Sequence, residues 1–237
     1  MGDWIAFWNS NHPIYVNPRH REVHYRAVAQ DILVRVPAGG RVLDYGCGEA
    51  LYADLIAASA AEVTLCETAQ SVRLGLTRRF GRHARIFVRS PEELAAMPDA
   101  SFDVVVMHSV AQYLRAEELD TALALFHRLL TRNGLLILGD ILPPHVSAVT
   151  DAIALLRFGF AHGFLGAAVV GLARTLLSDY WRLRTQLGLT RYSEAAMIEK
   201  LSRAGFSAHR DPANIGHNPA RLTFLGRPAP SPLTHAR

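Results

Sequence analysis

Val42-Leu43-Asp44-Tyr45-Gly46-Cys47-Gly48-Glu49-Ala50 is the stretch that decides the fold. Its first residues predict a buried strand, its two glycines break that strand, and an apolar-periodic helix is predicted to begin near Leu51. In an open parallel sheet this order places a ligand-binding crevice at the carboxyl end of the first strand. Gly46 and Gly48 remove side chains where the backbone turns and approaches the ligand. The helix start behind them offers unpaired N–H groups and the positive end of the helix dipole.

The same stretch argues against a phosphate ligand. Leu51 stands where a dinucleotide fingerprint has its third glycine, and Asp44 would repel a phosphate but could receive an ammonium group. The pattern resembles the first motif of class I S-adenosylmethionine-dependent methyltransferases, which reads hydrophobic-Asp/Glu-x-Gly-x-Gly. The resemblance implies an α/β, Rossmann-like fold with a mostly parallel seven-stranded sheet and an antiparallel last strand. It also implies that S-adenosylmethionine is bound by Asp44, Gly46, Cys47 and Gly48.

A second carboxylate lies at the spacing that this architecture requires. Residues 62–67 predict the second strand, and Glu67 is its last residue. An acidic side chain about 20 residues beyond the glycine turn hydrogen-bonds the ribose hydroxyls of a bound nucleoside. Because this spacing agrees independently with the glycine motif, the two signals together are more specific than either alone. A solvated glutamate at a strand end is the alternative.

The segment after the predicted third strand departs from the resembled pattern. In the family an acidic residue at this position commonly contacts the adenine amino group, whereas this chain has Ser90 there. The resemblance therefore implies a contact from Ser90, or from backbone groups near Pro91 and Glu92.

Residues 102–114 resemble the fourth-strand motif of the family. The apolar run from Phe102 predicts a central strand buried on both faces, with polar residues beginning where the strand ends at the crevice. The resemblance implies that His108 and Ser109 contact the cofactor, and that Gln112 and Tyr113 point towards the methyl group. Plain polarity at a strand end is the alternative for these residues.

The rest of the chain is predicted to complete this fold. Helices are expected over residues 19–36, 51–59, 117–131 and 193–204, and strands over 135–140, 206–210 and 221–225. Asn133-Gly134 is expected to end the third of these helices, and Ser193 to cap the last. Asp140 is placed at a strand end above the same crevice.

One long segment exceeds the minimal fold. Residues 151–187 are helical and apolar, but only about 16 residues separate Arg157 from Arg174, fewer than the ~20 that a membrane-spanning helix needs. A substrate lid, an oligomer surface or a helix in a membrane interface remain open. We expect an N-terminal segment with a lid helix (1–40), a methyltransferase domain (41–228) with a helical insertion (145–190), and a disordered tail (229–237).

The composition is that of a globular protein. Of the 237 residues 50% are hydrophobic and 19% charged. The pI of about 9.4 invites a nucleic-acid interpretation, but the basic residues are almost all scattered arginines. One local cluster is interpreted as a solvated edge of the sheet, with a patch for an anionic surface or an acidic substrate as the alternative; it holds Arg73, Arg78, Arg79, Arg82, Arg85 and Arg89. We find no Asn/Asp-Pro-Pro-aromatic motif and no RNA-binding module, so no nucleic-acid partner is expected.

The two cysteines, Cys47 and Cys66, suggest neither a disulfide framework nor a metal site. They fit a reducing, cytoplasmic setting. The first residues lack the basic and apolar regions of a signal peptide. Contact of the insertion with the inner face of a membrane, or with a second copy of the chain, is kept open.

Methyl transfer from a sulfonium is an in-line displacement, so positioning matters most and can account for about 7–11 kcal/mol of the barrier. A base is needed only for an acceptor that arrives protonated. Tyr113, His108 and His24 are the catalytic candidates. Substrate contacts are expected from Tyr15, Tyr25, Gln112 and Asp140, although packing of the aromatic rings on the sheet is the alternative for Tyr15, His24 and Tyr25.

The sequence thus predicts an S-adenosylmethionine-dependent methyltransferase that acts on a small-molecule or lipid-like acceptor with a hydrophobic body. A catalytically silent cofactor-binding module is a second hypothesis, which the intact Asp44 and Glu67 disfavour. An NAD-dependent oxidoreductase is a third, against which Leu51 and Asp44 argue. The acceptor atom is left open.

Overall fold

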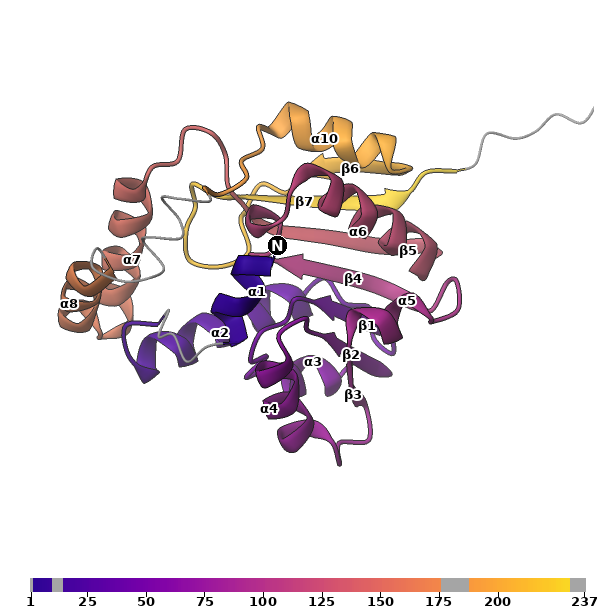
Figure 1. Cartoon of the computed structure of the whole chain (residues 1–237), viewed down its shortest axis with the longest axis horizontal. Helices are drawn as coiled ribbons and strands as arrows, with labels where there is room; N and C mark the ends of the chain where they lie inside the picture. Colours follow the sequence, from indigo (N-terminus) through magenta and orange to yellow (C-terminus); the bar gives the residue numbers. More distant parts are fainter. Residues whose placement is uncertain (1, 10–14, 176–187, 231–237) are drawn as a thin grey trace, which may run out of the picture.

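The structure is a computed structural model that describes residues 2–9, 15–175 and 188–230 (Figure 1). Within these residues the chain forms a seven-stranded sheet in the order β3-β2-β1-β4-β5-β7-β6. The strands are β1 (Arg41–Tyr45), β2 (Glu62–Cys66), β3 (Ile86–Arg89), β4 (Phe102–His108), β5 (Leu130–Ile141), β6 (Phe206–Arg210) and β7 (Leu222–Pro228). Only β7 runs antiparallel to its neighbours β5 and β6. This confirms the predicted sheet.

Helices cover both faces of the sheet and its carboxyl edge (Figure 1). The described helices are α1 (Gly2–Asn9), α2 (Pro18–Leu33), α3 (Ala53–Ala57), α4 (Gln70–Phe80), α5 (Pro91–Ala95), the 3₁₀ helix η1 (Ala111–Tyr113), α6 (Ala116–Leu129), α7 (Ala148–His162), α8 (Leu165–Thr175) and α10 (Glu194–Arg203). Ser193 caps α10 as expected, by accepting a hydrogen bond from the Ala196 N–H.

The central strand β4 divides the core into two layers. Val105 and Met107 pack with the cluster that contains Phe126 of α6, whereas Val104 and Val106 pack with the cluster on the side of α2, α3 and α4. Alternating side chains of a strand point to opposite faces, so a strand covered on both sides is apolar throughout. The continuous apolar run of β4 follows from this position.

Two predicted boundaries were wrong. The helix after the glycine turn spans only Ala53–Ala57, because the chain is still turning at Ala50, where φ is +41°. The helix expected to end at Asn133-Gly134 ends at Leu129, and those two residues belong to β5. Leu130 takes an extended conformation and pairs with Phe102, since burying its side chain in the sheet outweighs one more helical turn.

The arginine cluster has a largely structural role. Arg73 donates to the carbonyls of Glu67 and Thr68, and Arg79 donates to those of Glu49 and Ala50. Guanidinium groups here satisfy carbonyl oxygens at the ends of β2 and the glycine turn. These contacts favour the structural explanation of the basic cluster over an anion-binding surface.

The insertion forms a pair of packed helices, α7 and α8, at the carboxyl edge of the sheet (Figure 1). Gly159 lets them approach closely, since a Cβ there would lie 3.2 Å from the Cβ of Ala168. Ala168 and Phe164 pack in turn on Val23 of α2. None of the described helices has the length and apolar character that crossing a bilayer requires. Residues 176–187 of the predicted insertion and 231–237 of the predicted tail lie outside the described residues.

Candidate active site

A cavity of about 550 Å³ lies at the carboxyl ends of β1, β4 and β5. Its walls come from the glycine turn, from α1 and α2, and from the inner sides of α7 and α8. The predicted site residues that line it are Gly46, Cys47, Gly48, Glu67, His108 and Ser109 for the cofactor, and Tyr15, His24, Tyr25, Gln112, Tyr113 and Asp140 for the acceptor. The fold therefore brings most of the predicted site together.

The glycine turn is shaped for a ligand that touches the backbone. Gly46 and Gly48 have φ values of +71° and +55°, which side chains rarely tolerate. A Cβ on Gly46 would lie 2.4 Å from Cγ2 of Val110, and one on Gly48 would lie 2.8 Å from the Tyr25 hydroxyl oxygen. Both positions thus require glycine for space as well as for conformation.

Two carboxylates face this turn in different ways. Glu67 accepts hydrogen bonds from the N–H groups of Gly48 and Ala69, at 3.0 and 2.9 Å. Among the described residues, none donates a hydrogen bond to the carboxylate of Asp44. Burial, and then the nearby charge of Glu67, raise the pKa of Asp44 to about 7. A cation beside these two acids would offset their repulsion and favour the charged form of Asp44.

Two residues at the ends of β4 and β5 have strained backbones. Ser109 and Asp140 have φ values of +58° and +59° without being glycine. The Ser109 hydroxyl donates to Oδ2 of Asp140 at 2.7 Å and lies 3.2 Å from Nδ1 of His108. The other ring nitrogen of His108 bonds the carbonyl of Ile215 at 3.2 Å.

An ion-pair network that the sequence did not reveal connects α7 to the carboxyl ends of β4 and β5. Arg221, only 8% exposed, donates to both carboxylate oxygens of Asp151 at 3.0 Å and to Oε1 of Gln112 at 2.7 Å. Its Nη1 lies 3.5 Å from Oδ2 of Asp140. Gln112 also donates to the carbonyl of Ser109, so both ends of its amide bond protein groups. A lone arginine at a strand start gave no signal, because its partners are distant in sequence.

Four histidines meet on the acceptor side of the cavity. The ring of His24 lies 6.3 Å from His20, 6.2 Å from His108 and 5.9 Å from His217, centroid to centroid. Burial lowers the pKa of His20 to about 4, and lowers those of His24 and His217 as well. These three imidazoles are therefore neutral near pH 7, and the wall that they form is uncharged.

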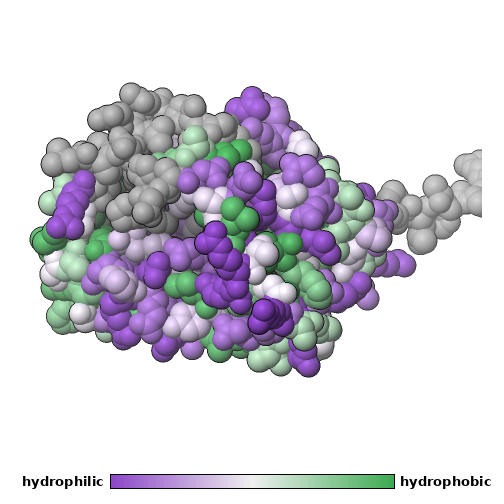
Figure 2. Space-filling view, turned by 60° about the horizontal axis from the view of Figure 1, so that its bottom comes forward, coloured by the Kyte–Doolittle hydropathy of each residue, from purple (hydrophilic) through white to green (hydrophobic). Residues whose placement is uncertain are grey.

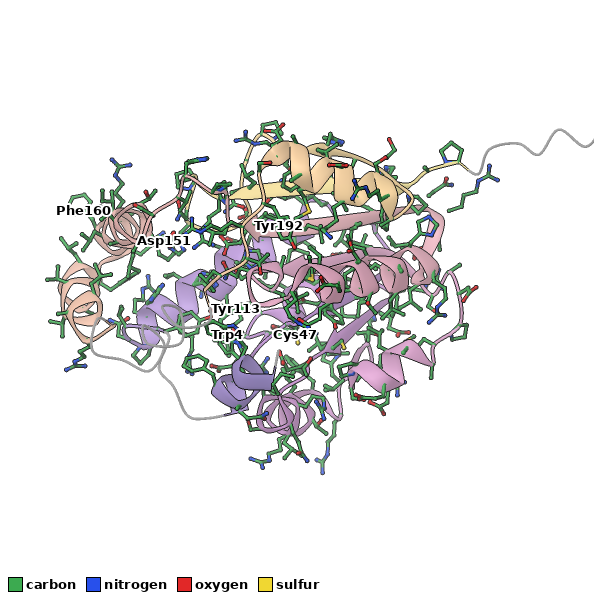
Figure 3. All side chains as sticks on the ribbon, turned by 45° about the horizontal axis from the view of Figure 1, so that its top comes forward. Trp4, Cys47, Tyr113, Asp151, Phe160 and Tyr192 are labelled. Atoms are coloured by element: carbon green, nitrogen blue, oxygen red, sulfur yellow. The ribbon has the colours of Figure 1, made fainter. Side chains whose placement is uncertain are left out.

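The N-terminal helix adds an aromatic wall. Trp4 and Trp8 pack on Tyr113, with ring centroids 4.7 and 5.6 Å apart (Figure 3). Trp4, Phe7 and Trp8 all line the cavity. The sequence showed these residues but gave them no role, because a short helix at the chain end has no predictable docking site.

Four predicted cofactor contacts do not line the cavity, namely Asp44 near the end of β1 and three residues at the start of α5. Ser90 caps α5 by accepting from the Glu93 N–H, while Glu93 accepts from the Ser90 N–H. Neither Ser90, Pro91 nor Glu92 lines the cavity. The adenine contact from this segment stays a prediction.

The comparisons with known proteins agree with this geometry. A family model described as a methyltransferase domain matches residues 43–138. This part of the chain is a class I S-adenosylmethionine-dependent methyltransferase domain. No curated protein matches the sequence. The match covers the glycine turn, Glu67, the whole of β4, and β5 as far as Leu138.

Solved structures similar to this methyltransferase share its fold at low sequence identity. A complex of DhpI with SAH superposes with a TM-score of 0.61 at 13% identity, covering 95% of each chain. Human N-acetylserotonin methyltransferase in complex with SAM gives a TM-score of 0.55 at 13% identity, over 87% of this chain and 52% of that one. A SAM-dependent methyltransferase from Thermotoga maritima gives 0.53 at 17% identity, over 86% and 88%.

S-adenosylmethionine, the cofactor of the family, fits the residues present. Its ammonium group would be received by Asp44, which is half-buried and lacks a described donor, and the glycine turn leaves the backbone of Gly46 and Gly48 open to it. Glu67 lies in the cavity wall at the position expected to bind the ribose. Within the described residues, no group of three His, Cys, Asp or Glu side chains is arranged to hold a metal ion.

Proposed function

We propose that this methyltransferase modifies a small-molecule or lipid-like acceptor with a hydrophobic body. The observation that carries the proposal is the composition of the acceptor side of the cavity. Trp4, Trp8 and Leu155 line it together with histidines that are neutral near pH 7. Such a wall stabilises an uncharged, partly aromatic molecule by burial, whereas a nucleic acid would require exposed cations.

The roles of the chain's residues follow from their positions. Asp44 and Glu67 hold the charged amine and the sugar of the cofactor, and Gly46 and Gly48 let it approach the backbone. When bound, S-adenosylmethionine supplies an electrophilic methyl group on a sulfonium. Tyr113, His108, His24, Tyr15 and Tyr25 orient the acceptor and exclude water from the cavity.

The experiment begins with calorimetry of S-adenosylmethionine and S-adenosylhomocysteine on the full chain. A panel of hydrophobic acceptors, namely phenols, amines, fatty acids and isoprenoid quinols, is then incubated with the protein and examined by mass spectrometry for a gain of one methyl group. Cofactor binding with no methylated product from any class would favour the catalytically silent module. Binding of a nicotinamide cofactor instead, seen by fluorescence, would favour the oxidoreductase.

We also propose that the outer faces of α7 and α8 contact an anionic lipid surface on the cytoplasmic side of a membrane. Val149, Ile153 and Phe160 project from one side of α7, with Phe160 78% exposed (Figure 3). On α8, Val169 and Val170 are exposed together with Arg174. Figure 2, with this end of the molecule at its left, shows hydrophobic patches there interrupted by hydrophilic residues.

The charges on α7 and α8 favour a membrane over a second copy of the chain as the partner of their exposed face. Arg157 and Arg174 are exposed on these helices, whereas their single acid, Asp151, is held by Arg221 on the inner side. An apolar face flanked by arginines fits anionic headgroups, but two such faces would repel each other. The inner sides of the same helices line the cavity, so a lipid-like acceptor would have a short path from the membrane to the site.

A further inference from the structure

We propose that Asp140 takes the proton released by the acceptor, and that Ser109 and His108 hold its carboxylate for this step. The inference rests on the proposed function in one respect, which is that the acceptor carries an ionisable O–H or N–H group. It assigns the base to a strand-end carboxylate instead of to Tyr113, His108 or His24.

The backbone shows that the position of Asp140 is enforced. Asp140 and Ser109 both have positive φ values, at the carboxyl ends of adjacent strands, a conformation that non-glycine residues keep only where the surrounding structure enforces it. Hydrogen bonds hold both, from the Ser109 N–H to the carbonyl of Gly139 at 3.1 Å and from the Asp140 N–H to Oδ1 of Asn214 at 3.2 Å. These conformations direct the two side chains at each other.

Counting protons shows that Ser109 is a donor with two acceptors. The Ile215 carbonyl can only accept, so Nε2 of His108 carries a proton, and in the tautomer protonated there alone Nδ1 is an acceptor. The Ser109 hydroxyl has one proton for two partners, Oδ2 of Asp140 at 2.7 Å and Nδ1 of His108 at 3.2 Å. It donates to Asp140 while that group is a carboxylate. Once Asp140 is protonated, Oδ2 is the weaker acceptor and the hydroxyl turns to His108.

The ring of His108 cannot turn away from this arrangement. A Cβ on Gly139 would lie 2.7 Å from Cδ2 of His108, so the ring packs directly against the β5 backbone. Its Nε2 donates to the Ile215 carbonyl, and its Nδ1 faces the Ser109 hydroxyl oxygen at 3.2 Å. His108 is therefore a positioning residue.

Asp140 keeps one oxygen for the acceptor. It lines the cavity, and Oδ1 accepts no hydrogen bond from any residue in the described ranges. Arg221 approaches Oδ2 to 3.5 Å, but its hydrogen bonds go to Asp151 and Gln112. Arg221 thus faces two carboxylates, Asp151 and Asp140, so these three groups together carry one net negative charge.

The charged and titratable groups around Asp140 come from every surrounding element. They are His24 on α2, His108 on β4, Asp151 on α7, His217 in the β6–β7 loop and Arg221 before β7. His24 and His217 are neutral near pH 7 because burial lowers their pKa values. No described imidazolium therefore competes with the acceptor for the carboxylate.

The step balances without a further reactant. The acceptor X–H forms the X–C bond to the methyl group, and the electron pair of the broken S–C bond stays on sulfur. The X–H proton passes to Oδ1 of Asp140, and the electron pair of the X–H bond remains on X. Asp140 then releases the proton to solvent as the products leave.

The first test needs no acceptor. The full chain, labelled with nitrogen-15 in histidine and carbon-13 in aspartate and bound to S-adenosylhomocysteine, is titrated from neutral to acidic pH by NMR. As the Asp140 carboxyl protonates, Nδ1 of His108 should move with the same midpoint, because it gains the Ser109 hydrogen bond. In Ser109→Ala this linked movement should vanish, whereas Ser101→Ala, a turn hydroxyl bonded to the Pro98 carbonyl, should keep it. The proposal would be overturned if the Nδ1 signal of wild-type His108 did not change as Asp140 protonates. It would also be overturned if that signal still changed in the Ser109→Ala variant.

The second test uses whichever acceptor the panel identifies. Asp140→Asn should bind S-adenosylmethionine as the wild type does in calorimetry, yet lose about 10²-fold or more in kcat, the usual contribution of general-base catalysis. The wild-type kcat should fall towards acidic pH, and the variant should lack this fall. If Asp140→Asn has the wild-type kcat and pH profile, Asp140 is not the base, and the proposed function is unaffected. If even the wild type makes no product, the proposed function fails, and the NMR titration still decides the role of Ser109.

Discussion

At the scale of single residues, the methyltransferase site trades stability for binding. Asp44 is the clearest case, because its pKa lies near 7 in the folded chain and near 4 in the unfolded one. Between these values the folded state binds more protons than the unfolded state. The free energy of unfolding therefore falls as pH rises through this window, and the cost is complete only above the folded pKa of about 7.

We predict that Asp44→Asn stabilises the ligand-free protein at neutral pH while it abolishes tight S-adenosylmethionine binding. The amide removes the buried charge next to Glu67, and with it the partner of the ammonium group. Thermal unfolding at neutral and acidic pH, together with calorimetry, measures both effects. The gain in melting temperature should disappear at acidic pH, where Asp44 is already protonated. A variant that binds the cofactor with unchanged affinity would contradict the role of Asp44.

Gly46→Val should destabilise the fold and prevent cofactor binding. Its Cβ would lie 2.4 Å from Val110 at a φ of +71°, so both the clash and the conformation are unfavourable. We expect a loss of more than about 1 kcal/mol in urea unfolding. Gly75→Ala is the matched control, since Gly75 lies inside α4 with nothing within 4 Å of an added Cβ. That control should gain up to about 1 kcal/mol of helix stability.

At the scale of elements, an ion pair between Asp151 and Arg221 links the described part of the insertion to the sheet. Asp151 is on α7, Arg221 immediately precedes β7, and Gln112 of η1 completes the contact. A buried charge whose partner is removed is strongly destabilising, and here the cost falls on the docking of α7.

Arg221→Met should release α7 from the sheet. We expect faster amide hydrogen exchange in residues 148–162, and a loss of about 3 kcal/mol in the opening free energy of this segment. Arg203→Met removes an exposed arginine that pairs with Glu199 within α10, and should change exchange by less than about 0.5 kcal/mol. Unchanged protection of α7 in the Arg221 variant would show that the apolar contacts with α2 suffice to dock it.

At the scale of the whole molecule, the cavity side and the outer side of the insertion have opposite characters. The inner side holds Asp151 and Leu155, the outer side exposes Phe160, Val169 and Arg157, and Arg174 is exposed where it also lines the cavity. This arrangement makes membrane contact a property of the assembled helix pair and not of either helix alone.

The full chain should therefore co-sediment with vesicles that contain phosphatidylglycerol, and much less with phosphatidylcholine vesicles. Phe160→Asp should weaken this binding by about 10-fold or more, since it replaces an apolar contact with a negative charge. Leu74→Asp, an exposed leucine on α4, is the control and should leave vesicle binding unchanged. A concentration-dependent dimer in light scattering that Phe160→Asp dissolves, with no vesicle binding, would show that the surface is a dimer contact.

Acid should destabilise the molecule through its buried histidines. His20, His24 and His217 have pKa values below the ordinary 6.5 in the folded state, with His20 near 4. As pH falls from about 6.5, the unfolded chain takes up these protons first, so the free energy of unfolding decreases with falling pH. Urea unfolding at a series of pH values measures this slope. His20→Gln should flatten it, and an unchanged slope would refute the contribution of His20.

The sequence alone determined the sheet and the glycine turn at the end of β1. The glycine turn, Asp44 and Glu67 carry local geometric requirements, namely a positive φ, a close backbone approach and a fixed spacing between strands, and such requirements are written into neighbouring residues. Only the tertiary structure decided the acceptor half. The bond from Ser109 to Asp140 and the one from Arg221 to Asp151 join residues 31 and 70 positions apart. No local pattern encodes such pairs, because they exist only after parallel strands place their carboxyl ends together and the insertion packs over them.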